Sequence, residues 1–121
     1  MRIKRAVADF KTKDTQASLD FYVGFLGFEV AMDLGWIATV ASSINPSAQV
    51  SFLTHDETAP VVPDLSVEVE DVGSLHEVAR RKGLEIVHPL SDEPWGVRRF
   101  FVRDPNGKVV NVMEHQTRPE S

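Results

Sequence analysis

The spacing of apolar and polar residues predicts two helices and eight short strands. Four apolar residues spaced i, i+3, i+4 and i+7 form one helical face over residues 15–26, namely Leu19, Tyr22, Val23 and Leu26. A shorter stripe of the same kind predicts a second helix over residues 72–82. The remaining apolar segments predict strands over residues 6–10, 28–32, 36–41, 49–53, 65–69, 84–87, 97–103 and 108–113.

The two halves of the chain repeat the same landmarks in the same order. Asp14 and Asp71 each precede a predicted helix, where a short carboxylate can accept the free N–H groups of the first turn. Gly27 and Gly83 follow 13 and 12 residues later, where a left-handed glycine would end each helix. Turn sequences then precede the last strand of each half, Asn45-Pro46 in the first and Asp104-Pro105-Asn106-Gly107 in the second. The repeat indicates a duplicated module.

The repeat predicts an α+β fold of two tandem β-α-β-β-β modules within a single domain, 1–121. The modules are expected at about 1–54 and about 64–116, joined by a proline-containing linker at 55–63 and followed by a frayed tail at 117–121. The strand over 109–113 is apolar on both faces apart from Asn111, so each sheet needs cover on the face away from its helix. We therefore expect one curved mixed sheet around a cavity, with the helices outside.

Composition limits the possible partners. The chain has 121 residues, with 42% hydrophobic and 26% charged residues, which is typical of a globular protein. It has no cysteine, and so neither a disulfide framework nor a thiolate site. The net charge of −5 makes nucleic acid and anionic membranes poor partners. No long apolar run or secretory signal is recognised, and a cytoplasmic location is expected.

Two segments resemble a known family. The run DTQASLDFYVGFLGF over residues 14–28 is similar to the opening signature of the vicinal oxygen chelate superfamily, and FFVRDPNG over 100–107 is similar to its closing signature. This superfamily includes glyoxalase I, bleomycin-resistance proteins, fosfomycin-resistance proteins and extradiol dioxygenases. The resemblance covers roughly residues 6–114, and it implies the fold more strongly than any one activity.

The resemblance also implies where a metal would be bound. Metal-dependent members carry their ligands on the first, fourth, fifth and eighth strands. Counting from the landmarks places these positions at Val7, Phe52, Asp64 and Asn111. Valine and phenylalanine cannot ligate a metal, and the other two supply one carboxylate and one amide. We therefore expect no metal and no other cofactor.

The candidate site is an apolar and aromatic pocket. Its predicted ligand-binding residues are Val7, Trp36, Phe52, Asp64, Trp95, Asn111 and Met113. Aromatic rings suit a planar ligand, and the Asn111 amide would orient it. Either Arg98 or Arg99 is expected to face inward, since neighbouring strand residues alternate in direction.

Other chemistry finds little support in the sequence. The four histidines, His55, His76, His88 and His115, share no metal-ligand spacing, and we expect them to be exposed or loosely hydrogen-bonded. No glycine-rich phosphate loop or nucleophilic triad is recognised.

Four functions remain open from the sequence. The first is a metal-free protein of the bleomycin-resistance type, which sequesters a planar or amphipathic small molecule. The second is a metal-dependent glyoxalase-like lyase or dioxygenase, and the third is a cofactorless enzyme with Asp64 as general base. The fourth is a structural or regulatory dimer without a ligand. In every case we expect a homodimer, since a half-open sheet of this size leaves strand edges to be covered.

Overall fold

A computed structural model describes residues 1–116, and its centre is one eight-stranded mixed sheet. The predicted tail, 117–121, lies outside the described residues. The strands are β1 (Ile3–Lys11), β2 (Glu29–Asp33), β3 (Ile37–Ala41), β4 (Gln49–Leu53), β5 (Leu65–Val69), β6 (Ile86–Glu93), β7 (Val97–Arg103) and β8 (Val109–His115). Their order across the sheet is β2-β3-β4-β1-β5-β8-β7-β6, so each half of the chain supplies four adjacent strands. The predicted α+β fold is confirmed.

Both helical segments lie between the predicted landmarks. Helix α1 (Thr15–Leu19) starts after Asp14, whose carboxylate accepts the Ala17 N–H at 3.0 Å. Helix α2 (Val72–Arg81) starts after Asp71, whose carboxylate accepts the Ser74 N–H at 3.1 Å. Gly27 and Gly83 follow with φ of 91° and 69°, the left-handed backbone that glycine adopts most easily.

The first helix differs from its predicted winding in its second half. Residues Asp20–Phe25 form a π-helical segment, in which the Leu26 N–H donates to the Phe21 carbonyl at 3.0 Å. The wider turn rotates the later side chains away from the expected stripe. Leu26 is consequently 51% exposed, whereas Tyr22 still faces the sheet, with its ring centroid 4.7 Å from that of Phe52.

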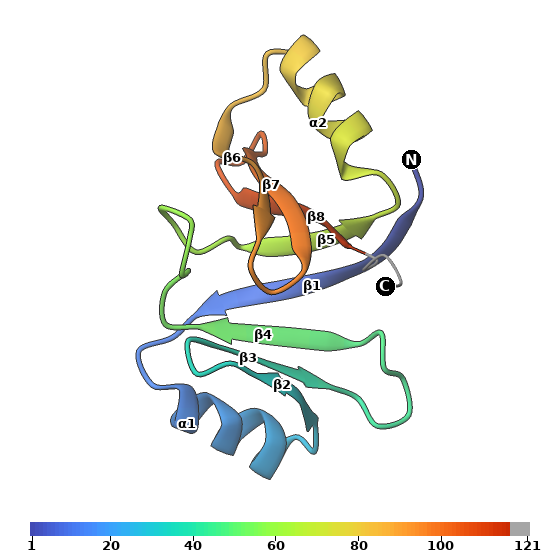
Figure 1. The fold of residues 1–121 in the computed structure, drawn as a ribbon. Helices are drawn as coiled ribbons and strands as arrows, with labels where there is room; N and C mark the ends of the chain where they lie inside the picture. Colours follow the sequence, from blue (N-terminus) through green and yellow to red (C-terminus); the bar gives the residue numbers. More distant parts are fainter. Residues whose placement is uncertain (117–121) are drawn as a thin grey trace.

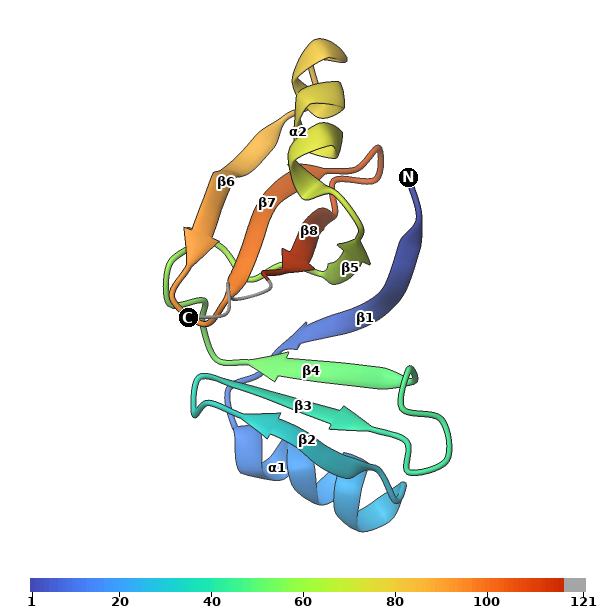
Figure 2. The same cartoon turned by 45° about the vertical axis from the view of Figure 1, so that its right-hand side comes forward.

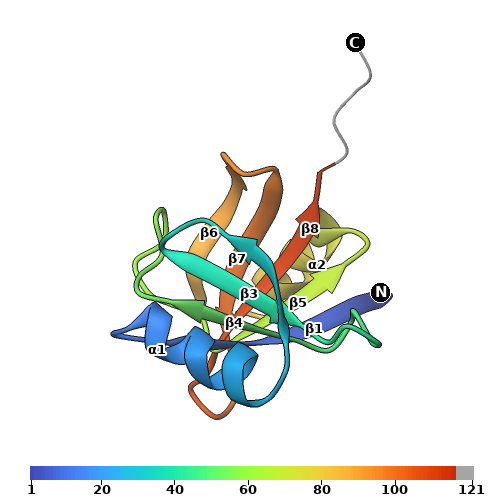
Figure 3. The same ribbon diagram turned by 90° about the horizontal axis from the view of Figure 1, so that it is seen from below.

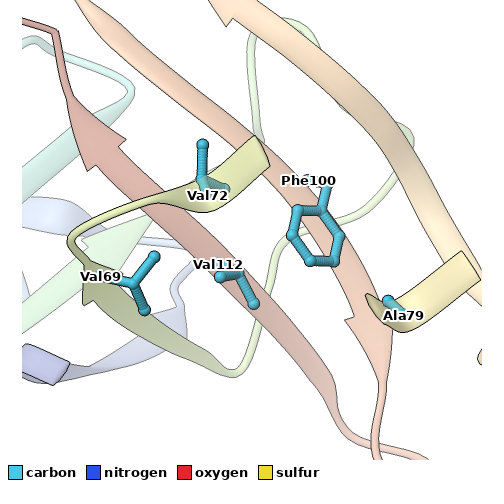
Figure 4. Packing of buried hydrophobic residues seen from close by; sticks show 5 residues of the cluster. All are labelled: Val69, Val72, Ala79, Phe100 and Val112. Atoms are coloured by element: carbon cyan, nitrogen blue, oxygen red, sulfur yellow. The ribbon is translucent and has the colours of Figure 1, made fainter. Parts of the chain in front are cut away.

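The two helices lie at opposite ends of the molecule, with the sheet between them (Figures 1 and 2). Under α2, a core cluster joins the helix to β5, β7 and β8 (Figure 4). Its members are Val69, Val72, Ala79, Phe100 and Val112. In the first half, Ala38, Val40 and Phe52 are buried on strands β3 and β4. Both cores are formed by the apolar alternation of the strands.

Strand β6 extends further than the sequence predicts. The predicted strand ended at residue 87, but β6 continues to Glu93 through Pro89. A proline is tolerated there because β6 is the last strand of the sheet and has one unpaired edge. Two register shifts between β6 and β7 accommodate the irregularity.

The two modules are joined where β1 pairs antiparallel with β5. Within each module the first strand pairs parallel with the last, β1 with β4 and β5 with β8. The view from below shows the strands of the second module crossing those of the first at a steep angle (Figure 3). The sheet is therefore strongly curved but not closed, and β2 and β6 remain as edges. Neither helix within residues 1–116 is long and apolar enough to cross a membrane.

The packing of Phe52 gives a stability prediction. Phe52 is 2% exposed, and its replacement by Ala removes a ring from the core under the first helix. We expect Phe52→Ala to lower the free energy of unfolding by about 3–5 kcal/mol in urea denaturation. Phe25→Ala is the matched control, since Phe25 is 73% exposed, and it should change the same quantity by less than about 0.5 kcal/mol. Equal effects of the two substitutions would contradict this packing.

The homodimer stays a prediction, which is based on the exposed edge strand β2. All five β2 residues are exposed, among them Val30 at 50% and Met32 at 38%. An uncovered apolar edge is a common site of pairing with a second chain. Light scattering at micromolar concentration should give twice the chain mass of 13.5 kDa. A mass of 13.5 kDa at every concentration would contradict the prediction.

Candidate functional site

The inner face of the curved sheet lines a cavity of about 250 Å³. Strands of both modules contribute to its wall, together with the loop before β3 and the loop between β4 and β5. Its apolar wall includes Val7, Trp36, Trp95, Val97 and Met113. The ring centroids of Trp36 and Trp95 lie 5.2 Å apart with their planes at 61°, an edge-to-face pair. Each module therefore contributes one indole to the same cavity.

A row of five polar side chains, the polar row, crosses the cavity floor on five adjacent strands. In the order of the sheet its members are Thr39, Ser51, Asp9, Ser66 and Asn111. The registers explain the row, because Thr39 pairs with Ser51, Ser51 with Asp9, and Ser66 with Asn111. The Thr39 and Ser51 hydroxyls are 2.7 Å apart. Four of the five residues are buried, and Ser66 is half-buried.

Donor directions fix how the centre of the polar row is arranged. The Asn111 Nδ2–H donates to Ser66 Oγ at 3.0 Å, and Ser66 Oγ donates its own proton to Asp9 Oδ2 at 2.6 Å. Asp9 Oδ2 is therefore an acceptor. The amide oxygen of Asn111, Oδ1, is buried and has no partner within the described residues.

Asp9 has a strongly perturbed acidity. Burial in the cavity wall raises the pKa of its carboxyl to about 7 from 3.8. The Ser66 hydrogen bond and the charge of Arg99 oppose this rise, whereas the neighbouring charges of Asp56 and Asp64 add to it. Asp9 consequently changes charge close to neutral pH. A buried carboxyl of this kind in a cavity is typical of functional sites.

A buried charge cluster closes one side of the cavity. The Arg99 guanidinium binds Asp56 through two hydrogen bonds of 3.0 and 2.7 Å, and it also reaches Glu93 at 3.3 Å. Thr58 accepts from Arg99 at 3.0 Å and donates to Glu93. The guanidinium carbon lies 5.0 Å from the Trp95 ring centroid, a cation–π contact. The cluster thus connects the loop between β4 and β5 to β7.

Asp56 is the anchor of that loop. Burial alone would raise the pKa of Asp56, but the hydrogen bonds and charge of Arg99 outweigh this effect and hold the pKa below its usual value of 3.8. The Asp56 carboxylate also accepts the N–H groups of Thr58 and Ala59, at 3.2 and 3.0 Å. The loop beside the cavity is therefore held by an ionised carboxylate on a fixed guanidinium.

The cavity brings together five of the seven predicted site residues, namely Val7, Trp36, Trp95, Asn111 and Met113. The structure also decides between the two arginines. Arg99 lines the cavity and is 4% exposed, whereas Arg98 points away and pairs with Asp92 at 3.5 Å.

Phe52 does not line the cavity, contrary to the prediction. It packs toward the first helix, while its neighbours Ser51 and Leu53 face the cavity. The predicted position is one residue too far along β4, because Ser51 follows Asn45 by six residues whereas Asn111 follows Asp104 by seven. The parallel registers align Ser51, and not Phe52, with Asn111.

Asp64 does not line the cavity either. It is exposed just before β5, and its carboxylate accepts the Val109 N–H at 2.8 Å. That hydrogen bond turns the side chain toward the start of β8. Asp64 therefore stabilises the junction between two strands.

Sequence reasoning missed four of the five residues of the polar row, on β1, β3, β4 and β5: Asp9, Thr39, Ser51 and Ser66. A signal for Asp9 was present. It follows Val7 at the two-residue spacing of one strand face, so the first strand carries an acidic residue on the face expected to line the pocket. Thr39 and the two serines carried no such signal, since small hydroxyl residues are common on either face of a strand.

One of the four histidines differs from expectation. His88 is 6% exposed, and its Nε2 lies 3.3 Å from Glu93 Oε1, behind the Arg99 cluster. Its burial follows from the irregular register of β6, which turns this residue inward. His55 and His115 are exposed and contact Glu57 and Glu68, as expected for surface histidines.

The cavity does not fit the transition metal that metal-dependent relatives would imply. Within residues 1–116, no three His, Cys, Asp or Glu side chains are grouped so that they could hold a metal ion. The polar row offers three hydroxyls, one amide and a single carboxylate that is bound to Ser66. A divalent transition metal normally takes three or four protein ligands, commonly with imidazole among them.

The buried Asp9 carboxyl predicts a pH dependence of stability. The pKa of Asp9 is raised in the folded protein, so the folded state binds more protons than the unfolded state between pH 3.8 and about 7. Asp9 therefore lowers the free energy of unfolding as the pH rises through this window, by about 4 kcal/mol in total. Asp9→Asn removes this dependence. We expect the variant to gain stability relative to the unmodified protein between pH 5 and pH 8 in urea denaturation; a constant difference would contradict the burial argument.

Comparison with known proteins identifies the family. A model of the Glyoxalase/Bleomycin resistance protein/Dioxygenase superfamily matches residues 5–112. No curated protein matches the chain. Among solved structures, a member of this superfamily from Vibrio splendidus 12B01 is similar at 18% identity with a TM-score of 0.73, covering 94% of this chain and 99% of that chain.

Two further structures share the fold. A hypothetical protein from Bacillus halodurans C-125 is 15% identical, with a TM-score of 0.74 and full coverage of both chains. A methylmalonyl-CoA epimerase from Streptomyces coelicolor, in complex with 2-nitronate-propionyl-CoA, is 17% identical with a TM-score of 0.72, covering 96% of this chain and 100% of that chain. At these identities the likeness concerns the fold alone. The match over residues 5–112, together with the paired modules, shows that the chain belongs to the Glyoxalase/Bleomycin resistance protein/Dioxygenase superfamily.

Proposed function

We propose that this protein binds a small planar or amphipathic organic molecule in its cavity without a metal, as a binding protein of the bleomycin-resistance type. One observation carries the proposal: the indoles of Trp36 and Trp95 meet beside the polar row in one cavity. Flat apolar surface next to a few fixed polar groups is the usual composition of a small-molecule site.

The size of the cavity limits the ligand. Pockets for drug-sized molecules measure about 300–1,000 Å³, and this cavity measures about 250 Å³. A ligand with one or two rings is therefore favoured. The aromatic groups would bury its flat part, and the polar row would orient its polar substituent.

A second candidate is a cofactor-independent enzyme, and the acidity of Asp9 favours it. The sequence suggested Asp64 as the general base, but the Asp64 side chain lies outside the cavity. Asp9 lies in it, and a carboxyl with a pKa of about 7 suits proton transfer at neutral pH. In D₂O, such an enzyme would exchange a C–H hydrogen of its ligand for deuterium, which is seen as loss of that proton's NMR signal. Exchange catalysed by the unmodified protein and not by Asp9→Asn would support this candidate.

Ligand binding can be tested through the two tryptophans. Benzamide and quinoline, titrated in the presence of EDTA, should change the intrinsic fluorescence saturably. Cyclohexanecarboxamide is the non-planar control and should bind more weakly. Replacing Trp36 or Trp95 by Leu should weaken benzamide binding about 2- to 12-fold in calorimetry, the equivalent of about 0.5–1.5 kcal/mol of aromatic contact.

The surface variant Phe25→Leu should leave the affinity for benzamide unchanged, because Phe25 is exposed and does not line the cavity. Absence of binding by every planar compound would overturn the proposal. Stoichiometric zinc, nickel, manganese or iron in freshly purified protein, with an activity lost on chelation, would favour the metal-dependent lyase or dioxygenase instead.

A further inference from the structure

The polar row contains an acceptor that the protein itself does not satisfy. Asn111 is 5% exposed and lines the cavity, and its Oδ1 has no hydrogen-bond partner within residues 1–116. One of the two N–H groups of its Nδ2 donates to Ser66. A buried polar atom without a partner destabilises the protein, so a ligand N–H that reached Oδ1 would remove this cost.

The carboxylate of Asp9 is linked to the same Asn111 amide through the hydroxyl of Ser66. Ser66 Oγ is 3.0 Å from Asn111 Nδ2 and 2.6 Å from Asp9 Oδ2. Ser66 Oγ accepts one N–H of the Asn111 amide and donates its own O–H to Asp9, so the second N–H of Asn111 Nδ2 is the one donor of this chain of hydrogen bonds without a partner among the described residues. When Asp9 is ionised, Asp9 and Asn111 both present acceptor oxygens. The site therefore fits a group that carries two or more N–H donors.

The charges around the cavity also favour a cation. Arg99 is bound by Asp56 and Glu93, one guanidinium against two carboxylates, and Arg5 is bound by Glu68. No ion pair among the described residues includes Asp9, although it lies in the same cavity as both arginines. The Asp9 charge therefore has no ion-pair partner among the described residues.

We propose that the cavity selects a planar organic cation of the amidinium type, whose N–H groups bind the Asp9 carboxylate and Asn111 Oδ1 while its ring packs against Trp36 and Trp95. The inference rests on the proposed function, because it names the ligand class of that same cavity. An anion would meet the Asp9 carboxylate, and the two terminal nitrogens of Arg99 are already bound by two carboxylates, although its Nε has no partner among the described residues. The cation supplies a positive charge for Asp9 and an N–H donor for Asn111 Oδ1.

The inference makes binding depend on the protonation of Asp9. The charged groups that act on Asp9 are Arg99 from β7, Asp56 from the loop after β4, and Asp64 just before β5. With a pKa of about 7, the ionised fraction of Asp9 falls about tenfold from pH 8 to pH 6. A cation that stays protonated over this range should therefore bind about tenfold more weakly at pH 6.

The experiment compares three ligands that share one ring: benzamidine, benzamide and benzoate. Calorimetry at pH 8 should show benzamidine binding at least tenfold tighter than the neutral or the anionic compound. The benzamidine affinity should fall about tenfold at pH 6, whereas the benzamide affinity should stay constant. The pH series uses the unmodified protein, so it tests the inference even if a cavity variant fails to fold.

Two variants that each remove one negative charge distinguish a local effect of Asp9 on binding from a general effect of net charge. Asp9→Asn should reduce benzamidine binding to the level of benzamide, and the thermal transition checks that it is folded. Asp64→Asn removes the same charge from an exposed residue outside the cavity and should keep at least half of the benzamidine affinity.

Each outcome has a distinct meaning. If benzamide or benzoate binds as tightly as benzamidine, the cation inference is wrong and the proposed function stands. If benzamidine binds more tightly at low pH, a neutral Asp9 acts as a donor and the inference is again overturned. If none of the three ligands binds, and the other planar compounds also fail, the proposed function itself is wrong.

Discussion

The antiparallel pairing of β1 with β5 is the constraint on which the rest of the structure depends. Each module covers only one face of its strands with a helix, and neither can bury the other face alone. By joining the first strands of both modules edge to edge, this pairing makes one curved sheet whose uncovered faces line a common cavity. It also brings Asp9 of β1 within 2.6 Å of Ser66 of β5. The polar centre of the cavity thus lies on the junction of the two modules.

A second contact, the ion pair of Arg99 with Asp56, holds the connecting loop beside the cavity. Arg99 holds Asp56 of the connecting loop in a buried, two-point ion pair and stacks over Trp95. Removing either partner of such a pair leaves an uncompensated buried charge, which is far more costly than losing an exposed pair. The loop that connects the modules is consequently anchored to β7 beside the Trp95 indole.

The burial of Asp9 lowers the stability of the fold but favours the proposed binding of a cation. An ionised carboxyl in this wall disfavours the folded state above neutral pH, as the raised pKa shows. Its Ser66 hydrogen bond compensates only in part. A group that supplies a positive charge at Asp9 would remove the penalty. The feature that weakens the fold is therefore the one that gives the cavity its proposed selectivity.

Local sequence determined most of the fold. The caps at Asp14 and Asp71, the positive-φ glycines at 27 and 83, and the alternating strands all follow from interactions within a few residues, so they could be predicted. The doubled landmarks also indicated two modules and a cavity between them, and therefore Val7, Trp36, Trp95, Asn111 and Met113 as its lining.

Only the tertiary structure decided which polar groups meet. The distance from the turn to the cavity-facing residue differs by one between the modules, so Ser51 and not Phe52 faces the cavity, and Phe52 faces the core. A shift of one residue reverses every side chain of a strand, and no local pattern encodes it when both faces are buried. Likewise, the contact of Asp9 with Ser66 spans 57 residues, and that of Arg99 with Asp56 spans 43. Such pairs depend on how the two modules pack, and local propensity carries no information about that packing.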